Sequence, residues 1–440
     1  MKLIELFGIK RQAFPVVISM MLPCLLLGCG QEDRMVYTEV MQEEVELEDI
    51  QTTVGIEAVQ EVTEYQNSRI AQEEEKPQVT EEIEDLLEPQ AMDSQNEEVT
   101  LIMVGDMLMH TPVNESGVME DGSIDFSHLF NHTKDMIESA DIALVNQEVI
   151  LGGEELGISG YPAFNTYYEL GDALVDAGFD VMLHATNHAL DKGKKGIINC
   201  LAYWEESYPE IAVLGIQNSQ EEQDAIYVCE KNGIRIAILN YTYGTNGIPL
   251  PEDMPYAVNL MDKQKMEEDI EKAKEFSDFV VVCPHWGTEY VLETVDYQEN
   301  YAEFMLELGV DLVLGTHPHV IEPVEWMRDE EGHEMLVYYS LGNYVNCTSS
   351  ETEDIGQRML GAMATVTIAM DDEGEAYIKE YGAEPLVTYV SDDQEEIAVY
   401  PLDQFTDGMA FASHTIKYDT DFSKSYCEEL WEEIMGKNNY

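Results

Sequence analysis

Residues 310–319 read VDLVLGTHPH, an apolar run that ends in two histidines on either side of a proline. A short apolar run that ends at a glycine is typical of a strand buried on both faces of a sheet. Histidine is scarce in this chain, with ten in 440 residues. Two of them directly after one strand indicate a site at the edge of the sheet, where loops from several strands meet.

The same pattern recurs from residue 99 onward, where short apolar runs alternate with longer amphipathic stretches. This alternation predicts an α/β domain with largely parallel strands. After about residue 355 the sequence MATVTIAMDDEGEAYIKEYGAEPL predicts two strands joined by an acidic turn, and therefore an added C-terminal β-rich segment. The expected strands are 99–105, 142–146, 181–184, 234–240, 279–285, 310–316 and 335–343, and the expected helices are 169–177, 189–206, 262–276 and 297–308.

Nearly every one of these runs is followed by a residue that can bind a metal. The set mixes carboxylates, imidazoles and amide oxygens without thiolates, which suits manganese, iron or zinc. It predicts one or two divalent ions, since a pair about 3.5–4 Å apart would need about seven or eight such ligands. The residues are Asp106, Asn146, Glu148, Asn187, His188, Asp191, His285, Glu289, His317, His319 and Asn343.

Two of these groups have a specific expected geometry. In an extended loop residues i and i+2 face the same way, so His317 and His319 are expected to present both rings to one cavity, with Pro318 stiffening the loop. Asp191 follows His188 by one helical turn and can fix its tautomer, which would let His188 donate a proton to a leaving group. The alternative for this segment is a helix start capped by Asn187.

The N-terminal segment is expected to be a targeting sequence followed by a tether. A basic start and an uncharged stretch end in LLGC, residues 26–29, which resembles a bacterial lipobox with Cys29 as the lipidated residue. The alternative is an uncleaved membrane anchor, since the stretch approaches the roughly 20 residues of a spanning helix. Residues 30–98 carry 22 acidic and 3 basic side chains, which predicts a disordered linker. The rest of the chain is therefore expected to be extracytoplasmic and anchored to the cell membrane.

Composition limits the partners of the folded part. The chain has 22 basic and 89 acidic residues, a formal net charge of -67, so it lacks the basic surface that binds nucleic acid. One concentration of positive charge is Lys192, Lys194 and Lys195 in DKGKKG. The cysteines after Cys29 form no CxxC pair, which argues against a thiolate zinc site and favours buried free thiols.

Six motifs in fixed order carry a resemblance to a known family. VGDM, VNQE, ATNHALDKG, HWGTE, GTHPHV and YSLGN resemble the CapA/PgsA family of poly-γ-glutamate capsule synthesis proteins, in the calcineurin-like metallophosphoesterase superfamily. The resemblance covers roughly 99–347 and implies a four-layer αββα sandwich, so the expected domain is 99–350 and the β-rich extension expected from the pattern is 351–440. It also implies roles for these residues: metal ligation by Asp106, Glu148, Asn187, His285, His317 and His319, proton donation by His188 with Asp191 orienting it, and Asn146, Glu289 and Asn343 around them.

The chain departs from the wider superfamily at the first metal. Leu108 stands where that superfamily has a histidine, and His110 could replace it only if the loop bends back. Glu148 stands where a bridging aspartate is usual. Both departures put the first metal in doubt, and a single ion is an alternative to a pair.

Three functions are open at this point. The first is a surface lipoprotein that assists the synthesis, export or anchoring of an anionic polymer such as poly-γ-glutamate, with capsule-synthesis membrane proteins as partners. The second is a metal-dependent hydrolase of a phosphoester or an amide, unrelated to capsule. The third is a catalytically silent binding protein with the same fold.

Overall fold

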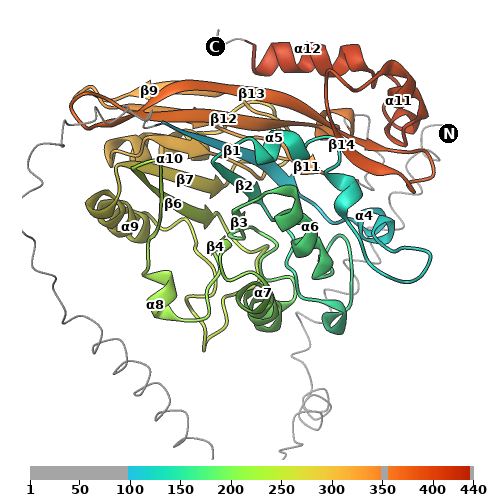
Figure 1. Cartoon of the computed structure of the whole chain (residues 1–440), viewed down its shortest axis with the longest axis horizontal. Coiled ribbons are helices and arrows are strands. Elements are labelled where there is room, and N and C mark those ends of the chain that lie inside the picture. Colours follow the sequence, from blue (N-terminus) through green and yellow to red (C-terminus); the bar gives the residue numbers. More distant parts are fainter. Residues whose placement is uncertain (1–97, 348–354, 437–440) are drawn as a thin grey trace, which may run out of the picture. The chain divides into compact units, whose positions relative to one another are not determined.

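Two mixed β-sheets carry the fold in the computed structural model, which describes residues 98–347 and 355–436 (Figure 1). The predicted signal peptide with Cys29 lies outside the described residues, as does the acidic linker apart from residue 98. Among the helices of the described ranges, none combines the length and the apolar character that crossing a bilayer requires.

The first sheet has eight strands and is parallel at its centre. Strand β1 pairs in parallel with β2 and with β11, and β2, β3 and β4 continue the parallel arrangement. Strands β12, β13 and β14 extend the other side of the sheet in antiparallel order. The strands are β1 (Glu98–Met107), β2 (Ile142–Asn146), β3 (Val181–Leu183), β4 (Ala212–Leu214), β11 (Asn343–Val345), β12 (Leu360–Met370), β13 (Ala376–Val390) and β14 (Ile397–Pro401).

The second sheet has six strands, and its four central strands are parallel. Antiparallel strands β5 and β9 close its two edges. The strands, in sheet order, are β5 (Tyr227–Lys231), β6 (Ile234–Thr242), β7 (Phe279–His285), β8 (Leu312–Leu314), β10 (Glu334–Tyr338) and β9 (Val324–Arg328).

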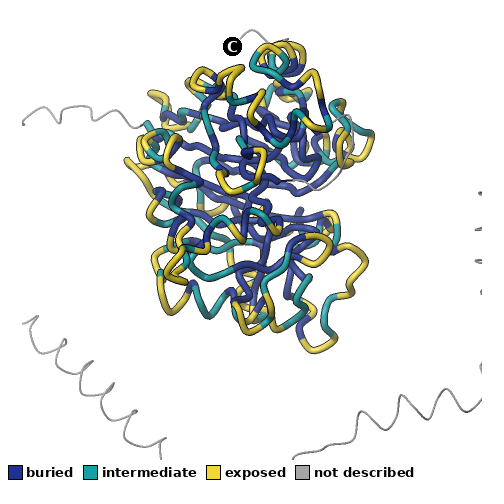
Figure 2. Tube along the Cα trace, turned by 90° about the vertical axis from the view of Figure 1, so that its right-hand side faces the viewer, coloured by how far each residue is buried: buried dark blue, intermediate teal, exposed yellow. Residues whose placement is uncertain are grey.

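The two sheets pack face to face, because alternate side chains along a strand enter two different apolar cores. In β6, Ile236 and Ile238 join the large core that also contains β1, whereas Ala237 and Leu239 face the other way. The second set packs with apolar residues of α9 (Lys263–Phe276) and α10 (Asp296–Glu307), which therefore cover the outer face of this sheet. Figure 2 shows the result, a buried interior with exposed chain mainly in peripheral loops and helices.

The remaining helices complete the layers. Helix α6 (Glu169–Ala177) and helix α7 (Gly193–Ser207) lie beside β2, β3 and β4, and their apolar residues enter the large core (Figure 1). The expected αββα order is therefore confirmed. The other helices are α4 (Thr111–Ser116), α5 (Lys134–Glu138), α8 (Gln220–Gln223), α11 (Asp407–Ala412) and α12 (Lys424–Ile434).

The predicted C-terminal β-rich segment continues the first sheet. The two expected strands are β12 and β13, joined at residues 371–375, and β12 pairs with β1 from Glu98↔Ala369 to Val104↔Met363. After β14 the chain becomes helical, with α11 and α12 in place of further strands. The five cysteines of the described residues are free thiols, four of them buried and Cys229 partly so.

Candidate metal centre

The carboxyl ends of the parallel strands bring the predicted polar residues to one edge of the two sheets. In the register of the first sheet Asp106 lies opposite both Asn146 and Asn343. Gly105 allows the close approach of β1 to the β11 loop, because a Cβ there would lie 1.9 Å from the carbonyl oxygen of Gly342. His285 ends β7 in the second sheet, and its Nδ1 lies 3.8 Å from Asp106 Oδ1. The predicted convergence of the strand ends is thus confirmed.

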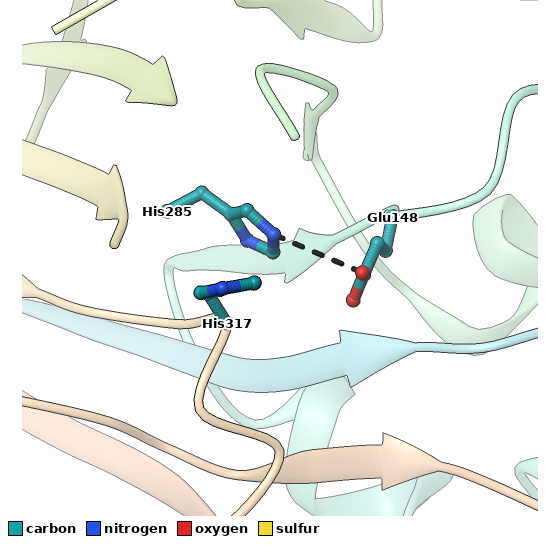
Figure 3. A group of neighbouring side chains, drawn as sticks. All are labelled: Glu148, His285 and His317. Carbon is teal, nitrogen blue, oxygen red and sulfur yellow. Dashed lines mark ion pairs between the residues drawn. The ribbon is translucent and has the colours of Figure 1, made fainter. Parts of the chain in front are cut away.

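Glu148, His285 and His317 form the first group that could hold a cation. Their candidate ligand atoms lie within 4.8 Å of one another, and all three residues are buried. The Glu148 carboxylate points toward the His285 ring, with Oε1 3.8 Å from Nε2, while the His317 ring lies beside it (Figure 3). The centroids of the two imidazoles are 4.8 Å apart.

Asp106, Glu148 and His319 form a second such group, which shares Glu148 with the first. His319 Nδ1 lies 3.0 Å from Asp106 Oδ2 and 3.1 Å from Asn343 Oδ1. Both oxygens are acceptors, so Nδ1 carries the proton and donates it. The Nε2 atom then faces Glu148 Oε1 at 3.8 Å, where it is available to a ligand.

The chemistry of these side chains fits a divalent cation. Neither carboxylate oxygen of Glu148 has a hydrogen-bond partner, and Nδ1 of buried His317 has none either. Buried polar atoms are almost always paired, so these three atoms are suited to bind a ligand. Carboxylate and neutral imidazole are the forms in which these residues bind metals.

Burial and mutual charge shift the pKa values of the group. Burial raises the pKa of Glu148 well above its usual range and lowers the pKa of His285 and His317. Burial also lowers the pKa of His319, but the carboxylates of Glu148 and Asp106 outweigh it and raise that pKa to about 9. Burial thus favours the neutral form of His285 and His317, while the two carboxylates favour positive charge at His319.

The loop that carries the two histidines differs from its expected form. His317 has φ 102° and His319 has φ 59°, so both are in the left-handed region and the extended conformation was wrong. The turn is nonetheless fixed to the site, because the amide of His317 donates to Asp106 Oδ2 at 3.2 Å. The two ring centroids are 5.7 Å apart, and together with Glu289 the two histidines form a third group of candidate ligands, in which Glu289 is exposed. The two histidines therefore lie close together, as expected, although the conformation of the loop differs from the expected one.

His188 and Asp191 have the expected mutual geometry. His188 Nδ1 donates to Asp191 Oδ2 at 2.7 Å, and the same oxygen accepts from the amide of Phe164 at 2.7 Å. The other ring nitrogen, Nε2, lies 3.9 Å from Glu148 Oε1. An imidazole held in this way beside a carboxylate cluster can exchange a proton there.

Asn187 and Asn246 connect this histidine to the cluster. Asn187 Oδ1 accepts from His285 Nε2 at 3.1 Å, and Asn187 Nδ2 donates to Asn246 Oδ1 at 3.4 Å. Asn246 Nδ2 in turn lies 3.4 Å from His188 Nδ1. Sequence reasoning did not identify Asn246, which lies in a loop after β6 with a φ of 51° that asparagine tolerates well.

A pocket of about 240 Å³ opens over this cluster. His188, His319 and Glu289 line it, and so does His110, whose ring packs edge-on against Phe164 at 5.2 Å. His110 therefore does reach the site, but none of the three candidate ligand groups among the described residues includes it. Arg358, Tyr290, Asn346 and Tyr161 also line the pocket and were not predicted.

Comparison with known proteins places the chain among capsule proteins. It is 28% identical over 264 residues to the capsule biosynthesis protein CapA of Bacillus anthracis, which covers 57% of this chain and 60% of the relative. It is 34% identical over 173 residues to the PGA biosynthesis protein CapA of Bacillus subtilis (strain 168), covering 39% of this chain and 44% of that protein. The matches thus span less than two thirds of the length of these relatives.

Among solved structures, the NAD nucleotidase of Haemophilus influenzae is 13% identical with a TM-score of 0.40, over 76% of this chain and 66% of that one. A family model described as bacterial capsule synthesis protein PGA_cap matches residues 100–348, which is more than half of the chain. The chain therefore belongs to the PGA_cap family of bacterial capsule synthesis proteins.

Proposed function

We propose that this protein is an extracytoplasmic lipoprotein that assists the synthesis, export or anchoring of an anionic capsule polymer, through a metal-dependent hydrolase-like site. The observation that carries the proposal is the buried cluster in which Glu148 has two oxygens without partners among three histidines. Each unpaired buried polar group costs about 1–3 kcal/mol, and a cation bound between Glu148 and the histidines would offset that cost.

The proposed ligands of the cation are six side chains from strand ends of both sheets. Asn146 and Asn343 would orient them, since Asn146 Nδ2 donates to Asp106 Oδ1 at 2.8 Å and Asn343 contacts His319. A divalent cation in this place supplies Lewis acidity toward a phosphoryl or carbonyl oxygen. The ligands are Asp106, Glu148, Asn187, His285, His317 and His319, for one ion or two.

His188 is the proposed proton donor. Asp191 fixes its tautomer and its orientation, Nε2 lies 3.9 Å from Glu148 Oε1, and the residue lines the pocket over the cluster. Because Nδ1 keeps its proton toward Asp191, the donor is the doubly protonated ring, which passes its Nε2 proton to the leaving oxygen or nitrogen of a bound ester or amide and becomes neutral. His188 would thus act beside the cation, not as one of its ligands.

The polymer substrate is proposed from the family and from the printed names of the relatives, one of which is a PGA biosynthesis protein. Partners of the same proposal are capsule-synthesis proteins of the membrane, and the anchor is a lipid on Cys29. Release of a Cys29→Ala variant from the membrane fraction would test the anchor, and retention of that variant in the membrane would contradict it.

A second candidate, a metal-dependent phosphoesterase or amide hydrolase without a role in capsule, is favoured by the His188–Asp191 pair itself. One experiment separates the candidates. The full chain is stripped with chelator, reloaded with manganese, zinc or iron(II), analysed for metal, and assayed on poly-γ-glutamate and on a chromogenic phosphodiester.

We expect metal in the wild type and in His188→Ala, with activity lost in the variant. Cleavage of the polymer supports the first candidate, and cleavage of the phosphodiester alone supports the second. A protein that retains no metal above background refutes both mechanisms. Metal retention without turnover of either substrate leaves a binding protein as the correct function.

A further inference from the structure

The pocket over the candidate metal ligands contains a positively charged side chain, Arg358, which lies outside the six motifs. Arg358 lies in the 3-10 helix Ile355–Met359, directly before β12, and is only 5% exposed. Among the described residues that line the pocket, it is the one Arg or Lys. It thus comes from the segment that the sequence assigned to the β-rich extension.

The backbone of Arg358 is linked by hydrogen bonds to a residue that contacts the candidate metal ligands. Its carbonyl oxygen accepts from Asn343 Nδ2 at 2.9 Å and from Asn346 Nδ2 at 3.3 Å. Asn343 also contacts His319 Nδ1 through its own Oδ1, at 3.1 Å. One asparagine therefore sets the position of the arginine relative to a proposed metal ligand.

The side chain is held as well. The guanidinium lies over the Tyr290 ring, with Cζ 3.6 Å from the centroid, and the amide of Tyr290 donates to the carbonyl of Pro318 at 2.7 Å. The Tyr290 ring lies 5.9 Å from the ring of His319. Stacking uses the face of a guanidinium, whereas its N–H groups donate within the plane, where they match the two oxygens of a carboxylate or phosphate.

The acidic domain repels an anionic substrate, so a positive side chain in the pocket would help to bind one. From residue 99 onward the chain has 66 acidic and 16 basic residues, so an anion approaching it is repelled. Two of the three lysines that the sequence singled out are engaged elsewhere, Lys192 with Ser159 and Lys194 with Asp253. Glu289 also lines the pocket, and a metal ion bound by Glu289, His317 and His319 would offset the negative charge of this carboxylate.

We infer that Arg358, stacked on Tyr290, binds an oxyanion of the substrate, a carboxylate or a phosphate, in the pocket beside the metal cluster. The inference rests on the proposed function, because the pocket is the approach to that cluster. It adds a substrate-binding residue and limits the substrate class to molecules with an anionic group close to the bond that reacts.

The test measures ligand binding and needs no turnover. The manganese-loaded full chain is titrated calorimetrically with inorganic phosphate and, separately, with glutarate, in the wild type, Arg358→Gln and Arg358→Lys. Arg328→Gln is the matched control, since Arg328 is exposed on β9, outside the pocket, and its loss changes the net charge equally. Metal content is measured on every sample.

We expect Arg358→Gln to lose about tenfold to 100-fold in affinity for at least one probe, since a bond to a charged group is worth about 1.5–3 kcal/mol. Arg358→Lys is expected to bind several-fold more weakly than the wild type, because lysine cannot donate two parallel bonds. Arg328→Gln should bind like the wild type. The probe that responds identifies the source of the oxyanion, phosphate or carboxylate.

The two possible failures are distinct. A wild type without bound manganese refutes the proposed function. Normal manganese content with equal affinities in the wild type and both Arg358 variants, or with no binding of either probe, overturns the present inference alone. Should Arg358→Gln not fold, the Arg358→Lys comparison decides, and affinity equal to the wild type overturns the inference.

Discussion

We expect Glu148→Gln to be more stable than the wild type without metal and less stable than the wild type with metal. In the metal-free wild type both Glu148 oxygens are buried without hydrogen-bond partners, and burial raises the pKa of that carboxyl group. Removing the acid removes this desolvation cost, so we expect Glu148→Gln to stabilise the metal-free protein by about 1–3 kcal/mol. The amide keeps the size and shape of the side chain, which limits effects on packing.

When metal is added, the stability difference between the variant and the wild type changes sign. A ligand that binds only the folded state stabilises it by about 2.7 kcal/mol when its free concentration is a hundredfold above Kd. Glu148 belongs to two of the three candidate ligand groups, so the variant should lose most of this gain. The assay is urea unfolding followed by tryptophan fluorescence, in chelator and in manganese. Trp286, fully buried next to His285, provides a reporter close to the site.

Glu322→Gln is the matched control. Glu322 is also fully buried and also has one carboxylate oxygen without a partner, yet it belongs to none of the candidate ligand groups among the described residues. It should retain the full stabilisation by manganese. The reasoning fails if Glu148→Gln destabilises the metal-free protein, or if its response to manganese equals that of Glu322→Gln.

Three further outcomes follow from the structure. Burial raises the pKa of Glu322 from 4.5 to about 8, so the folded state holds this proton more tightly than the unfolded state does. The free energy of unfolding should therefore fall as pH rises from about 4.5 to 8, by at most about 5 kcal/mol. Urea titrations across that window should show this loss in the wild type and not in Glu322→Gln. Gly105→Ala would place a Cβ 1.9 Å from the Gly342 carbonyl oxygen, so urea unfolding should show a loss of about 1–3 kcal/mol or more, and calorimetry a weaker affinity for manganese. Asp191→Asn should lower phosphodiesterase activity about 10- to 100-fold at unchanged metal content, because His188 loses the carboxylate that orients it; full activity would show that the pair has no role in the reaction.

The sequence was most informative about the central strands, because their burial on both faces leaves a continuous apolar run. Observed strands β1, β2, β6 and β7 contain the predicted runs or match them. The short strand β4 and the edge strands β5 and β9 were missed, since three to five residues on an edge show too little pattern to separate them from loops. The pairing of β12 with β1 joins residues more than 250 positions apart, and no local signal contains that information.

The candidate site followed from the topology, since parallel strands place all their carboxyl ends at one edge. Asn146 and His285 end their strands, Asp106 lies one residue before the end of β1, and the structure brings the three together. Arg358 could not be found in this way, because it precedes its strand and reaches the pocket only through the long-range β12–β1 pairing. Asn246 lies beyond the end of β6, in a loop whose path depends on packing.

The local cost of the cluster indicates that it is maintained for function. His317 and His319 both have positive φ, which for residues other than glycine costs of order 1–3 kcal/mol each. Glycine at either position would relieve the backbone but would remove the ring from the groups around Glu148 and Glu289. The strained loop and the unpaired oxygens of Glu148 belong to the same candidate metal site, and the binding energy of a cation would offset both costs. The metal-free fold is therefore expected to be least stable at the strand ends where its chemistry lies, with cation binding coupled to the ordering of the 317–319 loop.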